Sequence, residues 1–352
     1  MPDMRAFVMH GVGETGFVRK PIPRPGPNDA VVKTHVALVC TSDCHVVNGS
    51  IGKRFNLTLG HEATGVVHRL GEAVQSVRVG ARVAVNAITP CYQCHHCQRG
   101  YPSQCGGALG GWKLSHYRDG VFADYFLVNN ADANLAPIPD EISDEAACYA
   151  TDMMSTGFAG AEAATIPLGG SVAIYGQGPV GLMATVGARL QGAGQVITVD
   201  KRANRLALSR FYGADIIIDF TEVDPDEAIM DLTGGVGVDA AIEAIGSQMA
   251  FDSCLRVIRP GGVIVNIGIH SDGQAISILA HEGRTRAGAV TIRSILCPGG
   301  KARMSRLMRL IANRRVDPTR MTTHVFGFDQ LDRAFALMAT KEEEVIKPLI
   351  RF

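Results

Sequence analysis

Four of the nine cysteines in this 352-residue chain fall within one short segment. They form the pattern Cys91-x2-Cys94-x2-Cys97-x7-Cys105, so that four thiolates could surround one metal ion in a tetrahedron. Such a ligand set leaves no coordination position for a substrate. The pattern therefore predicts a structural zinc site.

Two histidines, His95 and His96, lie inside the same segment. Four cysteines already complete a zinc shell, so we expect both histidines at the surface. The alternative is that the cysteines are unpaired or form disulfides, which is unfavourable in a reducing compartment.

Three glycines, Gly176, Gly178 and Gly181, form a second pattern that could bind a ligand, with G-x-G-x-x-G spacing. An apolar run at 172–175 precedes them, and an Ala-rich segment of helical length follows. The first glycine permits a tight turn, the second lets the backbone approach a pyrophosphate, and the third allows close packing of helix and strand. The helix N-terminus offers free N–H donors to phosphates, so the segment predicts a dinucleotide site.

Asp200 ends the next β-branched run, 19 residues after Gly181, where the hydroxyls of an adenosine ribose should lie. Its carboxylate favours NAD(H) over NADP(H), because a 2′-phosphate would meet a like charge. Lys201 and Arg202 favour the opposite preference, since their positive charges could bind that phosphate. We place five further residues at the cofactor: Pro179, Val180, Ile267, Gly268 and Ile269.

Residues 155–297, which contain this turn, alternate between apolar strand candidates and helical stretches. This pattern predicts a doubly wound parallel sheet, the Rossmann arrangement. The strand candidates are 172–175, 196–199, 215–219, 240–244, 263–267 and 290–295.

The residues on either side of that segment differ in character. Residues 1–154 are β-rich, with strand candidates at 30–36, 64–70 and 82–85. We expect residues 298–352, with helices at 303–312 and 329–338, to rejoin them. The fold class is therefore α/β, with a dinucleotide domain inserted into a β-rich zinc-binding domain.

The composition describes an ordinary globular protein, with 46% hydrophobic and 19% charged residues. The formal net charge of +0 gives no reason to expect nucleic acid or an anionic membrane as partner. The N-terminus lacks an apolar signal region, and no run approaches the length of a membrane span. We expect a cytoplasmic protein with a small-molecule substrate.

Several further motifs extend over the whole chain: C-T-S-D-x-H from Cys40, G-H-E-A from Gly60 and T-D-M-M-S-T-G from Thr151. Together with the glycine turn they resemble the zinc-dependent medium-chain alcohol dehydrogenases, above all the bacterial and archaeal secondary-alcohol dehydrogenases. The resemblance implies a GroES-like fold for the β-rich domain. It also implies a homotetramer, or alternatively a dimer.

By this resemblance, Cys40, His61 and Asp152 bind a catalytic zinc ion, with Glu62 as a near or exchangeable fourth ligand. One sulfur, one nitrogen and one oxygen donor agree with that role, since they leave a fourth position open for substrate. Many relatives carry Cys in place of Asp152, and Cys148 lies four residues away. We prefer Asp152 because it is the position that precedes the S-T-G turn, in the motif T-D-M-M-S-T-G.

The resemblance also implies that Ser42 and His45 relay the hydroxyl proton to solvent, whereas we expect a structural role for Asp43. Trp112, Leu296 and Cys297 occupy positions that line the substrate pocket in relatives. The expected reaction is reversible hydride transfer between a secondary alcohol, which gives a ketone, and NAD(H); aldehydes are expected as further substrates. We expect two zinc ions per chain.

Two features depart from the secondary-alcohol relatives. These usually lack the four-cysteine segment, and they often prefer NADP, with Gly-Ser-Arg in place of Asp200-Lys201-Arg202. Two other functions remain open: a polyol or amino-alcohol dehydrogenase of the same superfamily, and a non-catalytic dinucleotide-binding redox sensor.

Overall fold

The computed structural model describes residues 3–271, 274–278 and 289–352. The chain forms two compact units, Met1–Ser155 with Cys297–Phe352, and Thr156–Leu296, which we describe separately. The second unit is inserted in the sequence of the first. Each boundary lies one residue from the expected one, so that Ser155 and Cys297 belong to the first unit.

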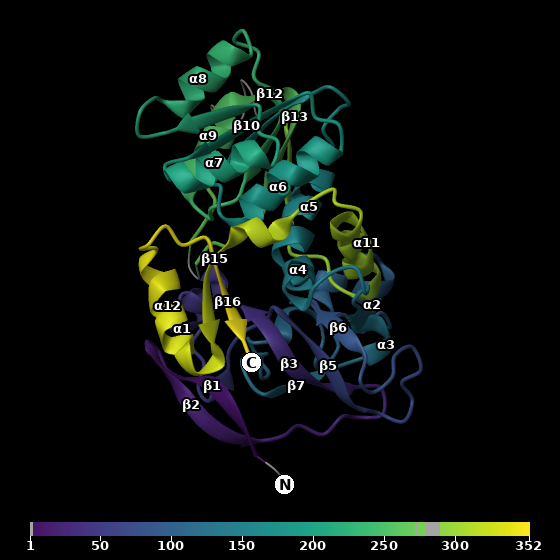
Figure 1. The fold of residues 1–352 in the computed structure, drawn as a ribbon. Helices are drawn as coiled ribbons and strands as arrows, with labels where there is room; N and C mark the ends of the chain where they lie inside the picture. Colours follow the sequence, from purple (N-terminus) through teal and green to yellow (C-terminus); the bar gives the residue numbers. More distant parts are fainter. Residues whose placement is uncertain (1–2, 272–273, 279–288) are drawn as a thin grey trace. The chain divides into compact units, whose positions relative to one another are not determined.

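The second unit is built on a parallel sheet. Its strands, in the described part of the chain, are β9 (Ser171–Tyr175), β10 (Gln195–Asp200), β11 (Ile216–Asp219), β12 (Val238–Glu243), β13 (Ile258–Asn266) and β14 (Thr291–Ser294). They lie in the order β11-β10-β9-β12-β13-β14, and every neighbouring pair is parallel. Figure 1 labels β10, β12 and β13 of this sheet. This order reverses direction beside β9, which confirms the doubly wound sheet.

Helices cover both faces of this sheet, and for this reason its strands are apolar throughout instead of alternating. One face carries α5 (Met153–Ala164), α6 (Pro179–Leu190) and α7 (Ala203–Phe211). The other carries α8 (Pro225–Leu232) and α9 (Gln248–Val257). Successive strand residues therefore enter two different cores: Val196 packs with α5 and α6, and Ile197 packs with α9.

The first unit contains the remaining strands, which are antiparallel except for one pair. They are β1 (Asp3–Gly11), β2 (Glu14–Pro21), β3 (Ala30–Leu38), β4 (Leu57–Thr58), β5 (Ala63–Leu70), β6 (Arg82–Val85), β7 (Tyr125–Val128), β8 (Leu135–Pro137), β15 (Thr322–Gly327) and β16 (Lys347–Arg351). One sheet has the order β15-β16-β3-β5-β6-β8, with β7 also on β3, and the other has the order β2-β1-β4.

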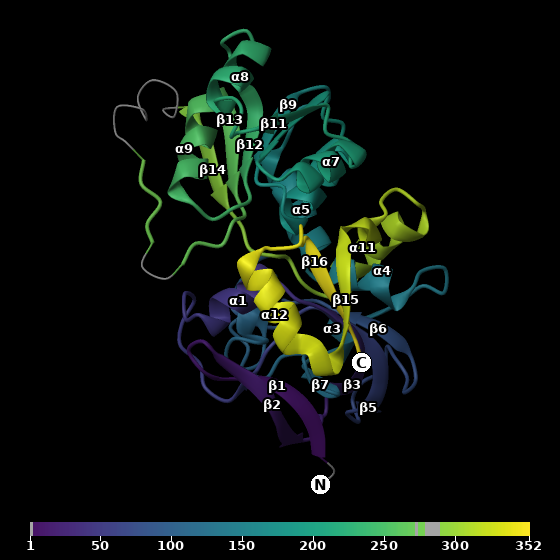
Figure 2. The same cartoon turned by 60° about the vertical axis from the view of Figure 1, so that its left-hand side comes forward.

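Its helices are short, apart from two near the C-terminus. They are α1 (Thr41–Val47), α2 (His95–Gln98), α3 (Ala131–Asn134), α4 (Asp144–Cys148), α11 (Lys301–Ala312) and α12 (Leu331–Thr340). α12 lies beside α1 and against β15 and β16 (Figure 2). The last segment thus shares one hydrophobic core with the first strands, as expected for a chain that returns to its first domain. Among the described residues, no helix is both long and apolar enough to cross a lipid bilayer.

Candidate active site and metal centres

Four side chains that could bind one metal ion meet in the first unit: Cys40, His61, Glu62 and Asp152. One ligand atom from each lies within 4.8 Å of the other three. Cys40 follows β3, His61 and Glu62 lie between β4 and β5, and Asp152 directly precedes α5. The antiparallel pairing of β3 with β5 therefore brings the first three together, and their S, N and O donors fit zinc.

His61 is held in a defined orientation by Asp43, which is fully buried. Asp43 Oδ1 lies 3.0 Å from His61 Nδ1, and Asp43 Oδ2 accepts a hydrogen bond from the Cys40 N–H at 2.9 Å. A proton on Nδ1, donated to Asp43, leaves the Nε2 lone pair for a metal ion. Nε2 does face the group, 3.4 Å from Asp152 Oδ2. The structural role that we expected for Asp43 is thus the orientation of two candidate ligands.

Burial and neighbouring charges shift the pKa values of two of these residues in opposite directions. Burial raises the pKa of the Cys40 thiol, but Lys347 and His61 outweigh it and bring that pKa to about 7. Burial also raises the pKa of Glu62 well above its ordinary value, against the attraction of Lys347. Glu62 Oε2 is buried and accepts no hydrogen bond from the described residues. An unsatisfied buried oxygen is costly, and a bound metal ion would satisfy it.

The structure separates the two alternatives for the third ligand. Asp152 belongs to the group, whereas Cys148 is fully buried with its Sγ 3.8 Å from the carbonyl oxygen of Val36. Burial raises the pKa of the Cys148 thiol well above its ordinary value. This thiol therefore has the surroundings of a core residue.

Ser42 and His45 both lie on α1, and Ser42 contacts the group. Ser42 Oγ is 3.3 Å from His61 Nε2, and the side chain is buried. His45 Nδ1 is buried without a hydrogen-bond partner in the described part of the chain. Burial lowers the pKa of His45, and the nearby Lys341 ammonium lowers it further. The relay through these two residues remains a prediction.

The three pocket candidates are placed differently. Trp112 is 38% exposed and makes edge-to-face contacts with His116 and Tyr117, so it is not a core residue. Cys297 is buried, with its Sγ 3.6 Å from Asn86 Oδ1. Leu296 is also 38% exposed and belongs to the second unit. Their role in a substrate pocket remains a prediction.

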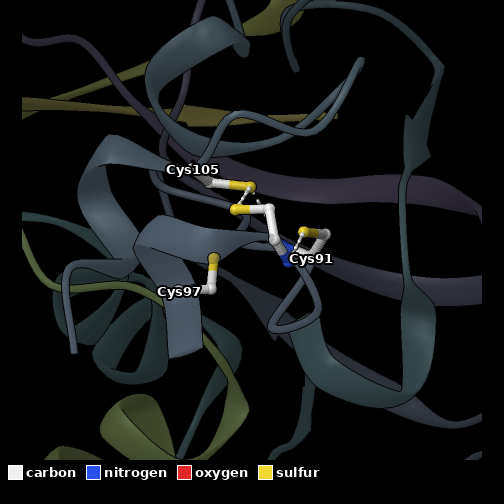
Figure 3. A group of neighbouring side chains, drawn as sticks. Cys91, Cys97 and Cys105 are labelled. Atoms are coloured by element: carbon white, nitrogen blue, oxygen red, sulfur yellow. Dashed lines mark hydrogen bonds between the residues drawn. The ribbon is translucent and has the colours of Figure 1, made fainter. Parts of the chain in front are cut away.

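The four cysteines of the spaced pattern form a second group, with their sulfur atoms within 4.8 Å of one another. Figure 3 shows the sulfur atoms of Cys91, Cys97 and Cys105 turned toward a common space. The Cys94 and Cys105 sulfur atoms are 3.9 Å apart. This is the arrangement that a closed, four-thiolate zinc site requires.

Backbone N–H groups stabilise thiolates in this second group. The N–H groups of Cys97 and Gly106 lower the pKa of the Cys94 thiol to about 6, whereas burial raises that of Cys97 to about 12. His95 and His96 lie on α2 and are exposed, outside the sulfur cluster. The geometry therefore offers four sulfur ligands and no histidine.

The glycine turn lies between β9 and α6. Gly176 has a φ of +90°, a conformation that L side chains rarely adopt. A Cβ on Gly181 would lie 1.8 Å from the carbonyl oxygen of Gly176, so only glycine allows this approach of helix to turn. Gly178 is the N-cap of α6 and Pro179 its first residue, which leaves the N-terminal N–H groups without intrahelical partners. Val180 follows in the first turn of α6, and Ile267, Gly268 and Ile269 follow β13.

Asp200 ends β10 beside this turn, as expected, and its carboxylate is fixed by the backbone. Oδ2 accepts the Gln177 N–H at 2.7 Å, and Oδ1 accepts the N–H groups of Lys201 and Arg202 at 2.8 and 3.0 Å. Arg205, which the sequence did not single out, places Nη1 3.8 Å from Oδ2. Its only sequence signal is that it follows Asp200 by little more than one helical turn.

Comparison with known proteins identifies the family. The model described as "Alcohol dehydrogenase GroES-like domain" matches residues 26–140, and that described as "Zinc-binding dehydrogenase" matches residues 179–313. The first match confirms the GroES-like fold expected of the β-rich unit.

Individual relatives match over almost the whole chain. NADP-dependent isopropanol dehydrogenases from Thermoanaerobacter brockii and Clostridium beijerinckii are 45% and 40% identical, each covering 99% of both chains. The solved structure of zinc dependent alcohol dehydrogenase 2 from Streptococcus pneumonia, apo form, has a TM-score of 0.91 at 28% identity and covers 99% of this chain and 98% of its own. The chain, as its motifs predicted, belongs to the zinc-dependent medium-chain alcohol dehydrogenase family.

Proposed function

We propose that the protein interconverts secondary alcohols and ketones, and also aldehydes, by hydride transfer with NAD(H). The observation that carries the proposal is the convergence of Cys40, His61, Glu62 and Asp152 on one group. Two relatives named isopropanol dehydrogenases support a secondary alcohol as the substrate.

The side chains divide the work of oxidation. The chemistry that a zinc ion supplies when bound by Cys40, His61 and Asp152 is polarisation of the substrate oxygen, which lowers the pKa of an alcohol. Ser42 accepts the hydroxyl proton, and His45 passes it toward solvent. The hydrogen on the carbinol carbon leaves as hydride to the nicotinamide, so that one alcohol and NAD+ give one ketone, NADH and a proton.

The cofactor preference rests on Asp200. Its carboxylate is held by three backbone N–H groups at the end of β10, so its negative charge cannot easily turn away from the ribose. A 2′-phosphate would meet this charge at close range. NADP(H) is the second candidate, because the basic residues Lys201 and Arg202 follow Asp200, because Arg205 Nη1 lies 3.8 Å from its Oδ2, and because the two relatives are named as NADP-dependent.

The test is a set of initial rates on secondary alcohols, primary alcohols and polyols with both cofactors. We expect the highest kcat/KM for a secondary alcohol with NAD+. A polyol as the best substrate would favour the polyol dehydrogenase alternative. Cofactor binding without turnover of any alcohol would favour the redox sensor.

The ligand assignment has its own test. Cys40→Ser and His61→Ala should abolish turnover while dinucleotide binding persists, because the glycine turn belongs to the other unit. Asp152→Cys should retain one zinc ion at this site and change the rate. Loss of that ion in Cys148→Ala, with Asp152 intact, would contradict the assignment.

We further propose a second, structural zinc ion held by Cys91, Cys94, Cys97 and Cys105, and a cytoplasmic homotetramer. The tetramer can be tested by light scattering of the purified protein at several concentrations.

A further inference from the structure

Lys347 forms an ion pair that is almost completely hidden from solvent. Its Nζ lies 2.7 Å from Glu62 Oε1, and the side chains are 1% and 0% exposed. Removing two charges from water is costly, and a buried pair persists only where its geometry is good. The roles proposed above for the zinc ligands and for the Ser42–His45 relay do not explain why Lys347 pairs with Glu62.

The oxygen that Lys347 binds also lies near one candidate metal ligand. Glu62 Oε1 lies 3.7 Å from His61 Nε2, the nitrogen that Asp43 leaves available for a metal ion. The other oxygen, Oε2, accepts no hydrogen bond from the described residues. A metal ion bound by either oxygen would therefore share the Glu62 carboxylate with the ammonium.

The strand pairing fixes Lys347 in this position. β16 pairs with the end of β3, with Leu349 opposite Leu38, and the Val39 N–H donates to the carbonyl oxygen of Pro348 at 3.1 Å. Cys40 follows Val39 directly. The backbone that presents the Cys40 thiol is thus hydrogen-bonded to the residue after Lys347, which ties the ammonium to the metal group.

We propose that Lys347 is a positioning residue that weakens Glu62 as a metal ligand and so keeps the fourth coordination position exchangeable between Glu62 and substrate. By holding Oε1, the ammonium opposes the approach of the Glu62 carboxylate to the metal. Without Lys347 an unpaired buried carboxylate would bind the metal more strongly, and a substrate would displace it less readily. The inference rests on the proposed catalytic metal site.

The experiment measures how readily a neutral ligand enters that position. The protein is loaded with Co²⁺, and imidazole is titrated while the visible absorption is followed. A four-thiolate site has no open position and should not respond. In Lys347→Met we expect the Kd of imidazole to rise about tenfold, within the range by which partners of metal ligands change metal sites.

The matched control is Glu62→Gln, which removes the anionic ligand but keeps the side-chain shape. Imidazole should bind Glu62→Gln more tightly than the wild type. Adding Lys347→Met to Glu62→Gln should change the Kd of imidazole less than twofold, because this variant has no Glu62 carboxylate that Lys347 could hold away from the metal. If Lys347→Met does not fold, Lys347→Gln, whose neutral amide retains a donor, should raise the Kd in the same direction.

Three outcomes would overturn the inference. An unchanged Kd in a folded Lys347 variant, with only a lower Tm, would make the ion pair purely structural. An equal rise in Kd with and without Glu62→Gln would show that Lys347 acts on the metal directly. A wild-type protein that acquires no Co²⁺ absorption from this site would contradict the proposed function itself, which the other two outcomes would leave intact.

Discussion

At the scale of single residues, charges in this protein are held in place by the backbone. Asp200 accepts three main-chain N–H groups, and Asp43 accepts one while orienting His61. A fixed carboxylate presents its charge without first losing conformational entropy, so its effect on a ligand is larger than that of a mobile one. Substitutions at such residues should change ligand binding, and they should also lower stability because the N–H donors lose their acceptor.

Asp200→Gly should reverse the cofactor preference. We expect the wild type to favour NAD+ at least about a hundredfold in kcat/KM, about 2.7 kcal/mol, because hydrogen bonds to the ribose are replaced by repulsion with NADP+. Asp200→Gly should raise kcat/KM with NADP+ and lower it with NAD+. Lys201→Ala is the control and should reduce only the use of NADP+. Equal wild-type efficiency with both cofactors would show that the basic residues decide the preference.

His45 should control the acid limb of alcohol oxidation. Burial and the Lys341 ammonium lower its pKa, and the neutral ring is the form that accepts a proton. The rate should therefore fall only below the ordinary pKa of histidine. Lys341→Met removes the neighbouring charge and should move the acid limb of kcat/KM to higher pH. A limb that stays in place would exclude His45 as the proton acceptor.

Short sequence motifs were enough to identify site residues that lie within them. They could not identify a residue that reaches the site from a distant part of the sequence. The motifs C-T-S-D-x-H, Gly-His-Glu and the Asp before Ser-Thr-Gly identified all four metal-group residues. Lys347 could not be found in this way, because 285 positions separate it from Glu62 and only the pairing of β16 with β3 joins them. The orientation of His61 by Asp43 likewise depends on side-chain geometry that the sequence does not specify.

At the scale of elements, the four-cysteine segment has little regular structure of its own. Between Cys91 and Cys105 it contains only α2 and a 3-10 turn at Pro102–Gln104, each about one turn in length. Helices this short are not stable alone. Ligation by four thiolates would therefore supply the cross-links that this segment lacks.

Cys94→Ala should lower stability before it affects catalysis. Each 1 kcal/mol lost corresponds to about 2–4 °C in Tm for a unit of this size, so a fall of several degrees is expected. kcat at a temperature well below Tm should change less than twofold. His95→Ala, an exposed residue of the same segment, should leave Tm unchanged. A fully active, equally stable Cys94→Ala protein would rule out a structural zinc ion there.

Elements with one clear environment were predictable from sequence. β9 and β10 are apolar runs between helices. The structure extends the predicted strand 172–175 by one residue at its start and the strand 196–199 by one residue at each end. β1 was not singled out, because Ala6–Met9 are all buried and the two-residue alternation disappears. The predicted helix 329–338 begins at Leu331, since Phe328–Gln330 form a 3-10 turn instead.

At the scale of the whole molecule, the two proposed metal sites and the dinucleotide turn belong to different units. Both groups of metal-binding side chains belong to the first unit, and the glycine turn to the second. Metal loss should therefore affect the two units differently.

Elemental analysis of fully loaded protein should give about two zinc ions per chain, since each group fills one tetrahedral site. A chelator should remove the ion of the catalytic group first, with loss of turnover, because the four-thiolate site has no open position through which to attack it. NAD+ binding should survive this first step. One zinc ion per chain in a fully active preparation, with four titratable thiols at Cys91–Cys105, would contradict the second site.

The insertion of one unit into the other also affects how the chain is made. Residues 156–296 are continuous, so this unit can fold as soon as it leaves the ribosome. The first unit cannot complete its sheet until β15 and β16 are synthesised, since β16 lies between β15 and β3. Cys40 and His61 are therefore made early but gain the neighbouring Lys347 charge only with the last strand. A nascent chain should acquire its dinucleotide site well before its catalytic metal site.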